Sequence, residues 1–572
     1  MSNLSYHTAV NLLFSLISTL LVTLILYKFD ISINHLSFLS FIATSLIYTI
    51  IYTTKRGLKS GFIQLLLIVL ILTISFCSSS FFRSINYDGM ETHQEKILAL
   101  QSGWNPINDN KFEKFDLITE PMLSVSDVVK NGGAVNVSYI FSAIIAKLTG
   151  NIENGKAINF IYFFIFGLIS TKTIFTFFKG YIAFLILIAL LINPILITQL
   201  YSFYLDGHVY SLYGSILLLY SMILFKKEYC HIFLIFILSI LLIGTKKKGI
   251  GLIGITLPLV FLTIILKSQQ KGRLLILSSF ISVVTLIVGI YGAKKLGFWD
   301  STNGHFPYTP TNIIKLLDPT TMDYWLGTEI PGSNKPYPMK DMGRIEQFVR
   351  SNFSETNILR EDLQWKNPFR VSKNELSFFY STAVDIRLGG FGPLFGGVLI
   401  ISFILLFLNL FTYKKSNTSL FLYIFIIILP CFFLPTWWAR WISFIWFVPI
   451  LITSYPFMHS NITKKFLIVD FSYKGESKIL LNLFCLILLI FNGCVVAYCN
   501  ICGHINENSK INADLKKIKS WNQPVEIFSK NFKSNRLWFY SNDIEFIFHK
   551  EKPLKEADLI LHRTGTLVYK TL

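Results

Sequence analysis

Charged residues are scarce in this chain, and acidic residues are the scarcest of them. Only 15% of its 572 residues are charged, and 33 Asp and Glu stand against 52 Lys and Arg, for a formal net charge of +19. In a soluble protein such a balance would indicate a nucleic-acid partner. Here many of the cations stand in short breaks between apolar runs, a pattern typical of the cytoplasmic side of a membrane protein. We therefore expect membrane lipids, and no nucleic acid, among its partners.

Several motifs of familiar catalysts are also missing. The sequence contains no phosphate-binding Gly-rich loop of the P-loop type, no Asp-x-Asp loop motif and no Gly-x-Ser-x-Gly elbow. The seven cysteines are scattered, and the Cys499–Cys502 pair has no second pair to complete a zinc site. These absences argue against cytoplasmic nucleotide-sugar chemistry and against a serine hydrolase.

Long apolar runs dominate what is present. Hydrophobic residues make up 52% and aromatic residues 16% of the chain. The runs are about 18–22 residues long, enough to cross roughly 30 Å of hydrocarbon as a helix, and a helix satisfies its own backbone there. We predict thirteen spans, at residues 8–27, 36–53, 61–81, 157–178, 180–200, 209–225, 231–245, 249–266, 273–293, 391–412, 418–435, 440–457 and 477–499.

The distribution of Lys and Arg predicts an orientation. With the N-terminus in the cytoplasm, most cations of the short breaks fall inside, and an odd number of spans places the C-terminus outside. Three hydrophilic blocks then face outward, at about 82–156, 294–390 and 503–572. The last block has strand-like stretches and one helical stretch, at Val525–Phe528, Arg536–Tyr540, Ile544–Phe548, Leu559–Leu561 and Ala513–Ser520. The predicted fold class is an all-α polytopic membrane domain (1–500) followed by a small α/β soluble domain (501–572).

The first outer block begins with a group of ionisable residues. Asp88, Glu91 and His93 follow the third span closely, and a helical pattern runs from Met90 to Gln101. Asp88 with Glu91 three residues later resembles a capping box, so Asp88 can simply cap that helix. Alternatively, Asp88 is a general base that takes a proton from an acceptor hydroxyl. The residues alone leave both interpretations open.

Four segments in order resemble the GT-C superfamily of membrane glycosyltransferases, among them the protein mannosyltransferase and lipid A aminoarabinose transferase-like group. The segments are Tyr87-Asp88-Gly89 with His93, Asn193-Pro194 with Gln199 and Tyr204-Leu205-Asp206-Gly207, Gly389 to Gly396, and Pro435 to Arg440. The last segment continues with Trp441 where similar proteins have Tyr. Three predicted spans precede the Asp88 loop, two more than the one that the family often has, and the tail matches no domain of the family.

The resemblance implies an activity and its partners. A polyprenyl-phosphate-linked sugar would be the donor, and a glycan, lipid or protein of the bacterial cell envelope the acceptor, at the outer face of the inner membrane. Asp88 would be the base, beside Tyr87, Glu91 and His93. Some members use a divalent metal such as Mg²⁺ or Mn²⁺ and others do not, and the sequence leaves this open, although Asp88 with Asp206 or His93 is a possible pair of ligands.

Further residues are expected to bind substrate. Arg440 with Trp437 and Trp438 is either an interfacial aromatic belt with a snorkelling Arg or a phosphate and sugar site. Lys246, Lys247 and Lys248 interrupt an apolar run on the predicted outer side, either because the topology is misjudged or because they bind the carrier phosphate. Asp206 and His208 stand at an outer span end. Arg387 is a further candidate, or a simple ion-pair partner of Asp385.

Two other classes of function stay open at this point. An O-antigen polymerase or ligase also has many spans and large outer loops, but typically relies on outer-loop Arg and His. A transporter would place ionisable residues near the middle of interrupted helices, whereas here they gather at outer span ends.

Overall fold

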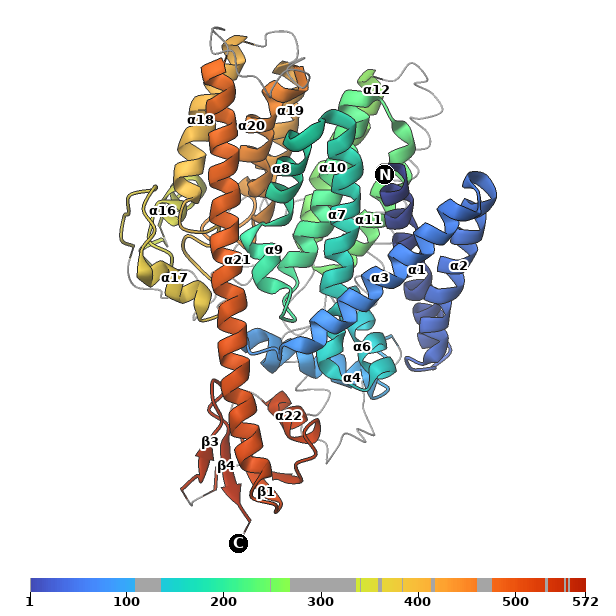
Figure 1. Ribbon diagram of the computed structural model, residues 1–572, viewed down its shortest axis with the longest axis vertical. Coiled ribbons are helices and arrows are strands. Elements are labelled where there is room, and N and C mark those ends of the chain that lie inside the picture. Colours follow the sequence, from blue (N-terminus) through green and yellow to red (C-terminus); the bar gives the residue numbers. More distant parts are fainter. Residues whose placement is uncertain are drawn as a thin grey trace, which may run out of the picture.

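The computed structural model is a bundle of long apolar helices with a small sheet domain at one end (Figure 1). It describes residues 2–107, 135–246, 248–267, 336–339, 341–357, 363–382, 384–412, 417–459, 476–529, 533–549, 552–553 and 556–571. Within these ranges seven helices are long and apolar enough to cross a membrane. Six shorter apolar helices accompany them. The chain is therefore a helical, polytopic membrane protein.

The first half of the bundle is built in chain order. Its helices are α1 (Ser2–Lys28), α2 (His35–Arg56), α3 (Leu58–Phe81), α7 (Ala157–Phe177), α8 (Gly180–Leu191), α9 (Pro194–Gln199), α10 (Asp206–Lys226), α11 (Ile232–Thr245) and α12 (Lys248–Lys267). The central helix is α10, whose apolar stretch is 94% buried, whereas those of α2 and α3 are only 28% buried. The side chains exposed on α2 and α3 are mostly Leu, Ile and Phe, as expected for helices that face lipid.

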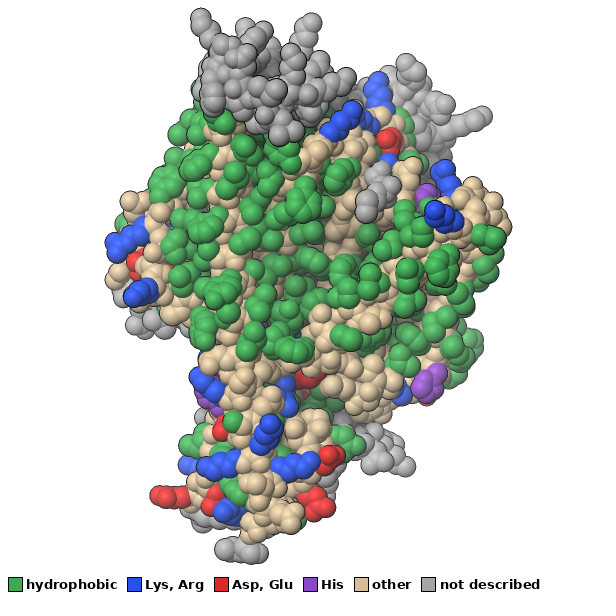
Figure 2. All heavy atoms as spheres, in the orientation of Figure 1, with side chains coloured by type: hydrophobic (Ala, Val, Ile, Leu, Met, Phe, Trp, Pro, Cys, Tyr) green, Lys and Arg blue, Asp and Glu red, His purple; other side chains and the backbone are tan. Residues whose placement is uncertain are grey.

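The second half begins with short helices outside the bundle, α16 (Arg344–Asn352) and α17 (Lys373–Tyr380). It continues with α18 (Phe395–Thr412), α19 (Asn417–Ile428), α20 (Phe447–His459) and α21 (Glu476–Lys519). In Figure 1, α21 runs the whole height of the bundle and continues into the sheet domain. Figure 2 shows hydrophobic side chains over most of this helical part, with charged side chains toward its two ends and over the region of α16 and α17.

The predicted spans overlap described helices with three differences, and one further span cannot be compared. Residues 180–200 do not form one helix, because Asn193 caps a new helix at Pro194 and accepts hydrogen bonds from the amides of Ile195 and Leu196. The helix predicted at 477–499 continues to Lys519 without a break. An unpredicted apolar helix, α6 (Val137–Thr149), lies within the first outer block. The span predicted at 273–293 lies outside the described residues.

The C-terminal domain is a four-stranded sheet packed against the end of α21. Its strands are β1 (Val525–Phe528), β2 (Phe546–Phe548), β3 (Leu559–Ile560) and β4 (Leu567–Lys570), in the order β2-β1-β4-β3. β1 pairs parallel with β2 and antiparallel with β4, which pairs antiparallel with β3. The stretch Arg536–Tyr540, predicted as a strand from its aromatic residues, is a short helix, α22. Its Leu537, Trp538 and Phe539 are all buried, so a helical turn serves their packing here.

Candidate functional site

Three carboxylates and three cations from distant parts of the sequence meet at one end of the bundle. Arg440 lies 3.7 Å from Asp88, 4.0 Å from Asp206 and 3.3 Å from Asp385. Lys246 and Lys248 each lie 2.6 Å from the same Oδ1 of Asp206. We refer to these six residues as the ion cluster. Most of it is buried, so water screens the charges only weakly.

Asp206 is the buried centre of the ion cluster. Its side chain has no exposed surface, and it stands in the first turn of α10, where the helix dipole favours a negative charge. Gln199 fixes this helix start, because its Oε1 accepts a 2.7 Å hydrogen bond from the amide of Gly207. Asn159 donates to the carbonyls of Gln199, Leu200 and Ser202 in the preceding turn. Asn193, Gln199 and Gly207 thus make the backbone contacts that fix the position of Asp206.

Asp88 is the most accessible carboxylate of the ion cluster. Its side chain is 40% exposed, against 26% for Asp385 and none for Asp206. It directly precedes a π-helical turn, η1 (Gly89–His93), which continues as α4 (Gln94–Gln101). No capping hydrogen bond is made by the Asp88 side chain, so the capping-box interpretation is wrong in this structure. The carboxylate faces Arg440 instead.

Aromatic rings surround the cations. The Arg440 guanidinium lies 3.9 Å from the ring centre of Trp438, which stacks on Trp437 with 4.7 Å between ring centres. Lys246 and Lys248 lie 5.1 and 5.4 Å from the ring centre of Trp441. Trp437 and Trp438 are almost completely buried. They therefore pack in the interior around the ion cluster rather than forming a belt against lipid.

Several buried polar atoms of this region have no hydrogen-bond partner within the described part of the chain. They are Asp206 Oδ2, Asp385 Oδ1, Arg440 Nε and the indole Nε1 of Trp437, Trp438 and Trp441. Buried polar groups in proteins are nearly always hydrogen-bonded, to protein or to water or ligand. The concentration of unpaired N–H donors beside Arg440 is what a site for an anionic ligand requires.

The glycine-rich segment at 389–396 lets the backbone approach Arg440. Gly389 and Gly392 have φ values of +61° and +98°, which glycine adopts most easily. A Cβ on Gly390 would lie 2.9 Å from the Cβ of Ala439. The amide side chain of Asn492 in α21 bonds to the Leu394 amide and the Phe391 carbonyl. This turn therefore packs closely against Ala439, the residue that precedes Arg440.

His93 and two tyrosines form the adjoining wall. His93 Nδ1 is hydrogen-bonded to the Tyr139 hydroxyl, and its ring centre lies 5.7 Å from that of Tyr204. Burial lowers the pKa of His93 to about 3, so its imidazole is neutral near pH 7. Burial, together with the nearby Asp88 carboxylate, raises the pKa of Tyr204 well above its ordinary value. Tyr204 also lies 5.5 Å from the Arg440 guanidinium.

The structure brings together only some of the predicted site residues. His208 bonds to Ser138 and Asn159 through its two ring nitrogens, inside the bundle. Arg387 lies 3.9 Å from Asp385, as the ion-pair interpretation expects, and so adds a positive charge beside the ion cluster. The Tyr87 side chain is 49% exposed. The Glu91 side chain and Lys247 lie outside the described residues.

Sequence reasoning missed Asp385, Tyr204, Tyr139 and Trp441 as members of the site. Asp385 was paired only with its neighbour Arg387, and its raised pKa reflects burial opposed by Arg440. Tyr204 and Trp441 belong to segments that resemble the glycosyltransferase family. Tyr204 is two residues from Asp206 in sequence and Trp441 directly follows Arg440, so their positions could have indicated a place in the site.

The three carboxylates of the site all lie beside Arg440. Among the described residues, no three His, Cys, Asp or Glu side chains are arranged to hold a metal ion. Asp88 and Asp206, the pair considered as ligands for Mg²⁺ or Mn²⁺, both face Arg440.

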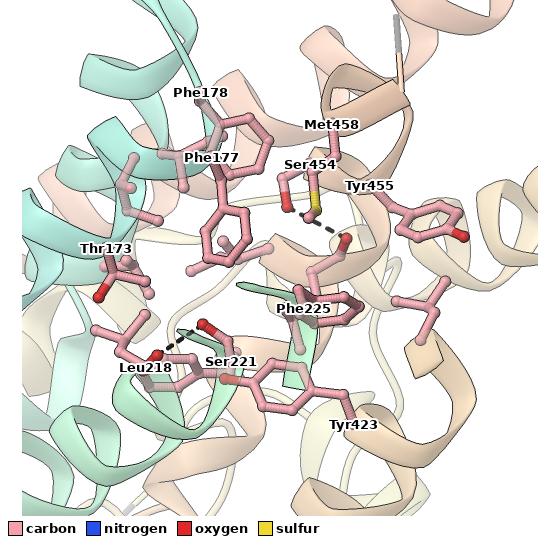
Figure 3. Close-up of a pocket in the computed structure, with 17 residues that line it drawn as sticks. Thr173, Phe177, Phe178, Leu218, Ser221, Phe225, Tyr423, Ser454, Tyr455 and Met458 are labelled. Atoms are coloured by element: carbon pink, nitrogen blue, oxygen red, sulfur yellow. Dashed lines mark hydrogen bonds between the residues drawn. The ribbon is translucent and has the colours of Figure 1, made fainter. Parts of the chain in front are cut away.

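A separate apolar pocket lies toward the other end of α10. Figure 3 shows Phe177, Phe225, Tyr423 and Met458 around it. Ser221, on its wall, is four helical turns from Asp206, roughly 22 Å along the axis. The pocket is therefore distinct from the ion cluster.

The site and fold together define a polytopic helical membrane protein with a buried ion cluster at one end of its bundle. No protein-family model matches the chain, and no curated protein is significantly similar to it.

Proposed function

We propose that the chain is a GT-C-type glycosyltransferase of a bacterial inner membrane. It has thirteen spans, a cytoplasmic N-terminus and a periplasmic C-terminal domain. A sugar is transferred from a polyprenyl-phosphate donor to a hydroxyl of a periplasm-facing glycan, lipid or protein of the cell envelope. The observation that carries the proposal is the position of Asp88, an accessible carboxylate 3.7 Å from a guanidinium that is surrounded by unpaired N–H donors.

The contacts of Arg440 support its role as a phosphate-binding group. Its distances to the three carboxylates are 3.3 to 4.0 Å, longer than the roughly 2.8 Å of a charge-assisted hydrogen bond. Its Nε has no hydrogen-bond partner among the described residues. The guanidinium is thus attracted by the carboxylates but not saturated by them, and it retains donors for phosphate oxygens.

In the proposed reaction, Asp88 accepts the proton of the acceptor hydroxyl while that oxygen attacks the anomeric carbon. The new C–O bond forms as the bond from the anomeric carbon to the phosphate oxygen breaks, so the configuration inverts. Polyprenyl phosphate leaves with both bonding electrons, and Arg440 and Lys246 stabilise its added negative charge. Preorganised cations are most effective where charge develops in the transition state. The neighbouring tryptophan rings suit the C–H face of a sugar.

The arrangement of the ends of the bundle supports the proposed orientation. Lys172 of α7 donates to Asn3 near the N-terminus, and Lys226 lies 5.2 Å from the ring centre of Phe177. These cations therefore lie together at the end that carries the N-terminus, whereas Asp206 begins α10 at the other end. A basic end that carries the N-terminus is typical of a cytoplasmic face. A phosphatase fused after Leu572 is expected to be active, and an inactive fusion would contradict the periplasmic tail.

Replacing Asp88 with Asn tests the proposed chemistry. The amide keeps the shape of the side chain but cannot accept the proton, so we expect at least about a hundredfold loss of transfer. The measurement is mass spectrometry of cell-surface glycans and lipids from cells with the wild-type protein, the variant or neither, at matched protein levels. Asp543→Asn is the control, because Asp543 is an exposed residue of the tail whose side chain is 91% exposed. Intact products with Asp88→Asn would refute the mechanism.

A further inference from the structure

The hydrophobic core of the C-terminal domain contains two residues of the loop that carries Asp88. Ile85 and Met90 are 4% and 1% exposed, and they pack in one cluster with the tail. The tail's side of that cluster consists of Ile511, Leu515, Ile518, Val525, Ile527, Trp538, Phe539, Ile544, Leu561 and Val568. Asp88 thus stands between two side chains that are buried in a domain more than 400 residues away in sequence.

A buried ion pair joins the same loop to the tail. Arg536 of α22 donates from its two terminal nitrogens to the two oxygens of Glu95 in α4, at 2.8 and 3.2 Å. Their side chains are only 2% and 6% exposed. Ser534 also donates a 2.7 Å hydrogen bond to the carbonyl of Met90. A paired fork of this kind fixes orientation as well as distance.

Glu153 provides a second buried connection. It accepts a hydrogen bond from the Ser84 amide at 3.0 Å and from the Trp538 indole at 3.4 Å, and it lies 2.6 Å from Lys156. Lys156 in turn donates to the carbonyl of Phe82. Both ends of the short segment between α3 and α4 are therefore tied, one through Glu153 and one through Glu95. In Figure 1, α22 lies beneath α4 at the bundle end that carries the tail.

We propose that the C-terminal domain is a positioning element for Asp88. Arg536 and Ser534 hold η1 and α4 so that the carboxylate of Asp88 stays beside Arg440. Burial of Ile85 and Met90 supplies the apolar part of this attachment, and the Arg536–Glu95 fork supplies its orientation. The idea rests on the proposed function for its consequence in catalysis, but the attachment itself is a property of the fold.

The test combines two measurements on the full-length protein. The first is amide hydrogen exchange of residues 84–101 in the detergent-purified protein, and the second is the yield of surface product in cells. Arg536→Ala removes one partner of a buried pair and leaves Glu95 uncompensated. We expect exchange in residues 84–101 to rise about tenfold or more, and product yield to fall about tenfold. Arg536→Lys should partly restore the slow exchange and the product yield, because lysine keeps the positive charge but cannot make the paired hydrogen bonds to Glu95.

Two further variants keep the test decisive. Ser534→Ala removes one hydrogen bond, so the protein should fold and show a smaller rise in exchange confined to the same residues. Lys519→Ala is the control, because Lys519 forms an exposed ion pair with Asp543 elsewhere in the tail, and it should change neither measurement. Wild-type exchange in both Arg536→Ala and Ser534→Ala would overturn the proposal, whatever the product yield.

The outcomes also separate this proposal from the proposed function. If Asp88→Asn abolishes the product while Arg536→Ala changes neither exchange nor yield, the positioning role is refuted and the glycosyltransferase proposal stands. If Arg536→Ala raises exchange while both it and Asp88→Asn leave the product intact, the attachment is supported and the glycosyltransferase proposal is refuted.

Discussion

Replacing Asp206 with Asn is expected to destabilise the protein strongly, in contrast to the same change at Asp88. Asp206 is completely buried and accepts from Lys246 and Lys248, each at 2.6 Å, through one oxygen. The two ammonium groups are therefore at most twice that distance apart. At about 5 Å and an effective dielectric constant of about 20, two positive charges repel by about 3 kcal/mol.

The magnitude follows from this arrangement. Removing one partner of a buried ion pair costs about 3–5 kcal/mol, and here a single carboxylate separates two lysines and attracts Arg440 as well. We therefore expect Asp206→Asn to cost at least about 3–5 kcal/mol, a large part of the roughly 5–15 kcal/mol by which proteins are stable. Asp88 is 40% exposed and 3.7 Å from Arg440, so Asp88→Asn should cost no more than about 1 kcal/mol.

The assay is thermal unfolding of both variants and the wild type, purified in the same detergent. The unfolding midpoint of Asp206→Asn should be clearly lower than that of Asp88→Asn. Adding Lys246→Met to Asp206→Asn should recover part of the loss, because it removes one of the charges left without a partner. Equal midpoints for the two single variants, or no recovery in the double variant, would show that Asp206 does not hold the ion cluster together.

Two further predictions concern the neighbours of the ion cluster. Burial holds the pKa of His93 at about 3, below the 6.5 of the unfolded chain, so His93 contributes stability that is complete above pH 6.5 and is lost as the pH falls toward 3. Up to about 2 kcal/mol should be lost between pH 6.5 and 5, and the midpoint of His93→Gln should depend less on pH; an unchanged dependence would contradict this. Gly390→Ala should lower the midpoint by the equivalent of about 1–3 kcal/mol, because its Cβ would lie 2.9 Å from that of Ala439. Gly254→Ala, with open space at its Cβ, should not lower it, and equal effects would argue against the close approach.

The apolar runs predicted where most of the described helices lie, while the number of thirteen spans stays a prediction. The structure differs from the prediction where a helix-capping residue or a tertiary contact outweighs the hydropathy or composition of the segment. Asn193 and Pro194 lie inside an apolar run, where one helix ends and another begins. The hydropathy of the run therefore predicted a single span at a point where the backbone turns. Arg536–Tyr540 has the aromatic composition of a strand, yet it forms a helix whose Trp538 and Phe539 lie in the core of the tail and whose Arg536 bonds to α4. Neither of those contacts is visible in local sequence.

Part of the site was predictable for a different reason. The positive-inside pattern and the order of the spans predict that Asp88, Asp206, Lys246 and Arg440 share one side of the membrane, and the structure brings them together at one end of the bundle. Their individual roles stay predictions. The sequence predicts which side of the membrane a residue faces, but not its distance from other residues. It therefore did not predict that Asp385 lies 3.3 Å from the guanidinium of Arg440.

The exposed fractions of the three carboxylates suit them to different parts in the proposed mechanism. Asp206 has no access to a substrate, and its two short contacts with lysines make it the charge that keeps those cations in a buried place. Asp385 is partly buried between Arg387 and Arg440, so it helps to hold the Arg440 guanidinium in place. Asp88 has the largest exposed fraction of the three, so in the proposed mechanism it is the carboxylate that the acceptor hydroxyl reaches. Its loop is also attached at both ends, to Glu153 and to Arg536. In the proposed mechanism these attachments keep the accessible base beside Arg440, and the C-terminal domain supplies one of them through Arg536.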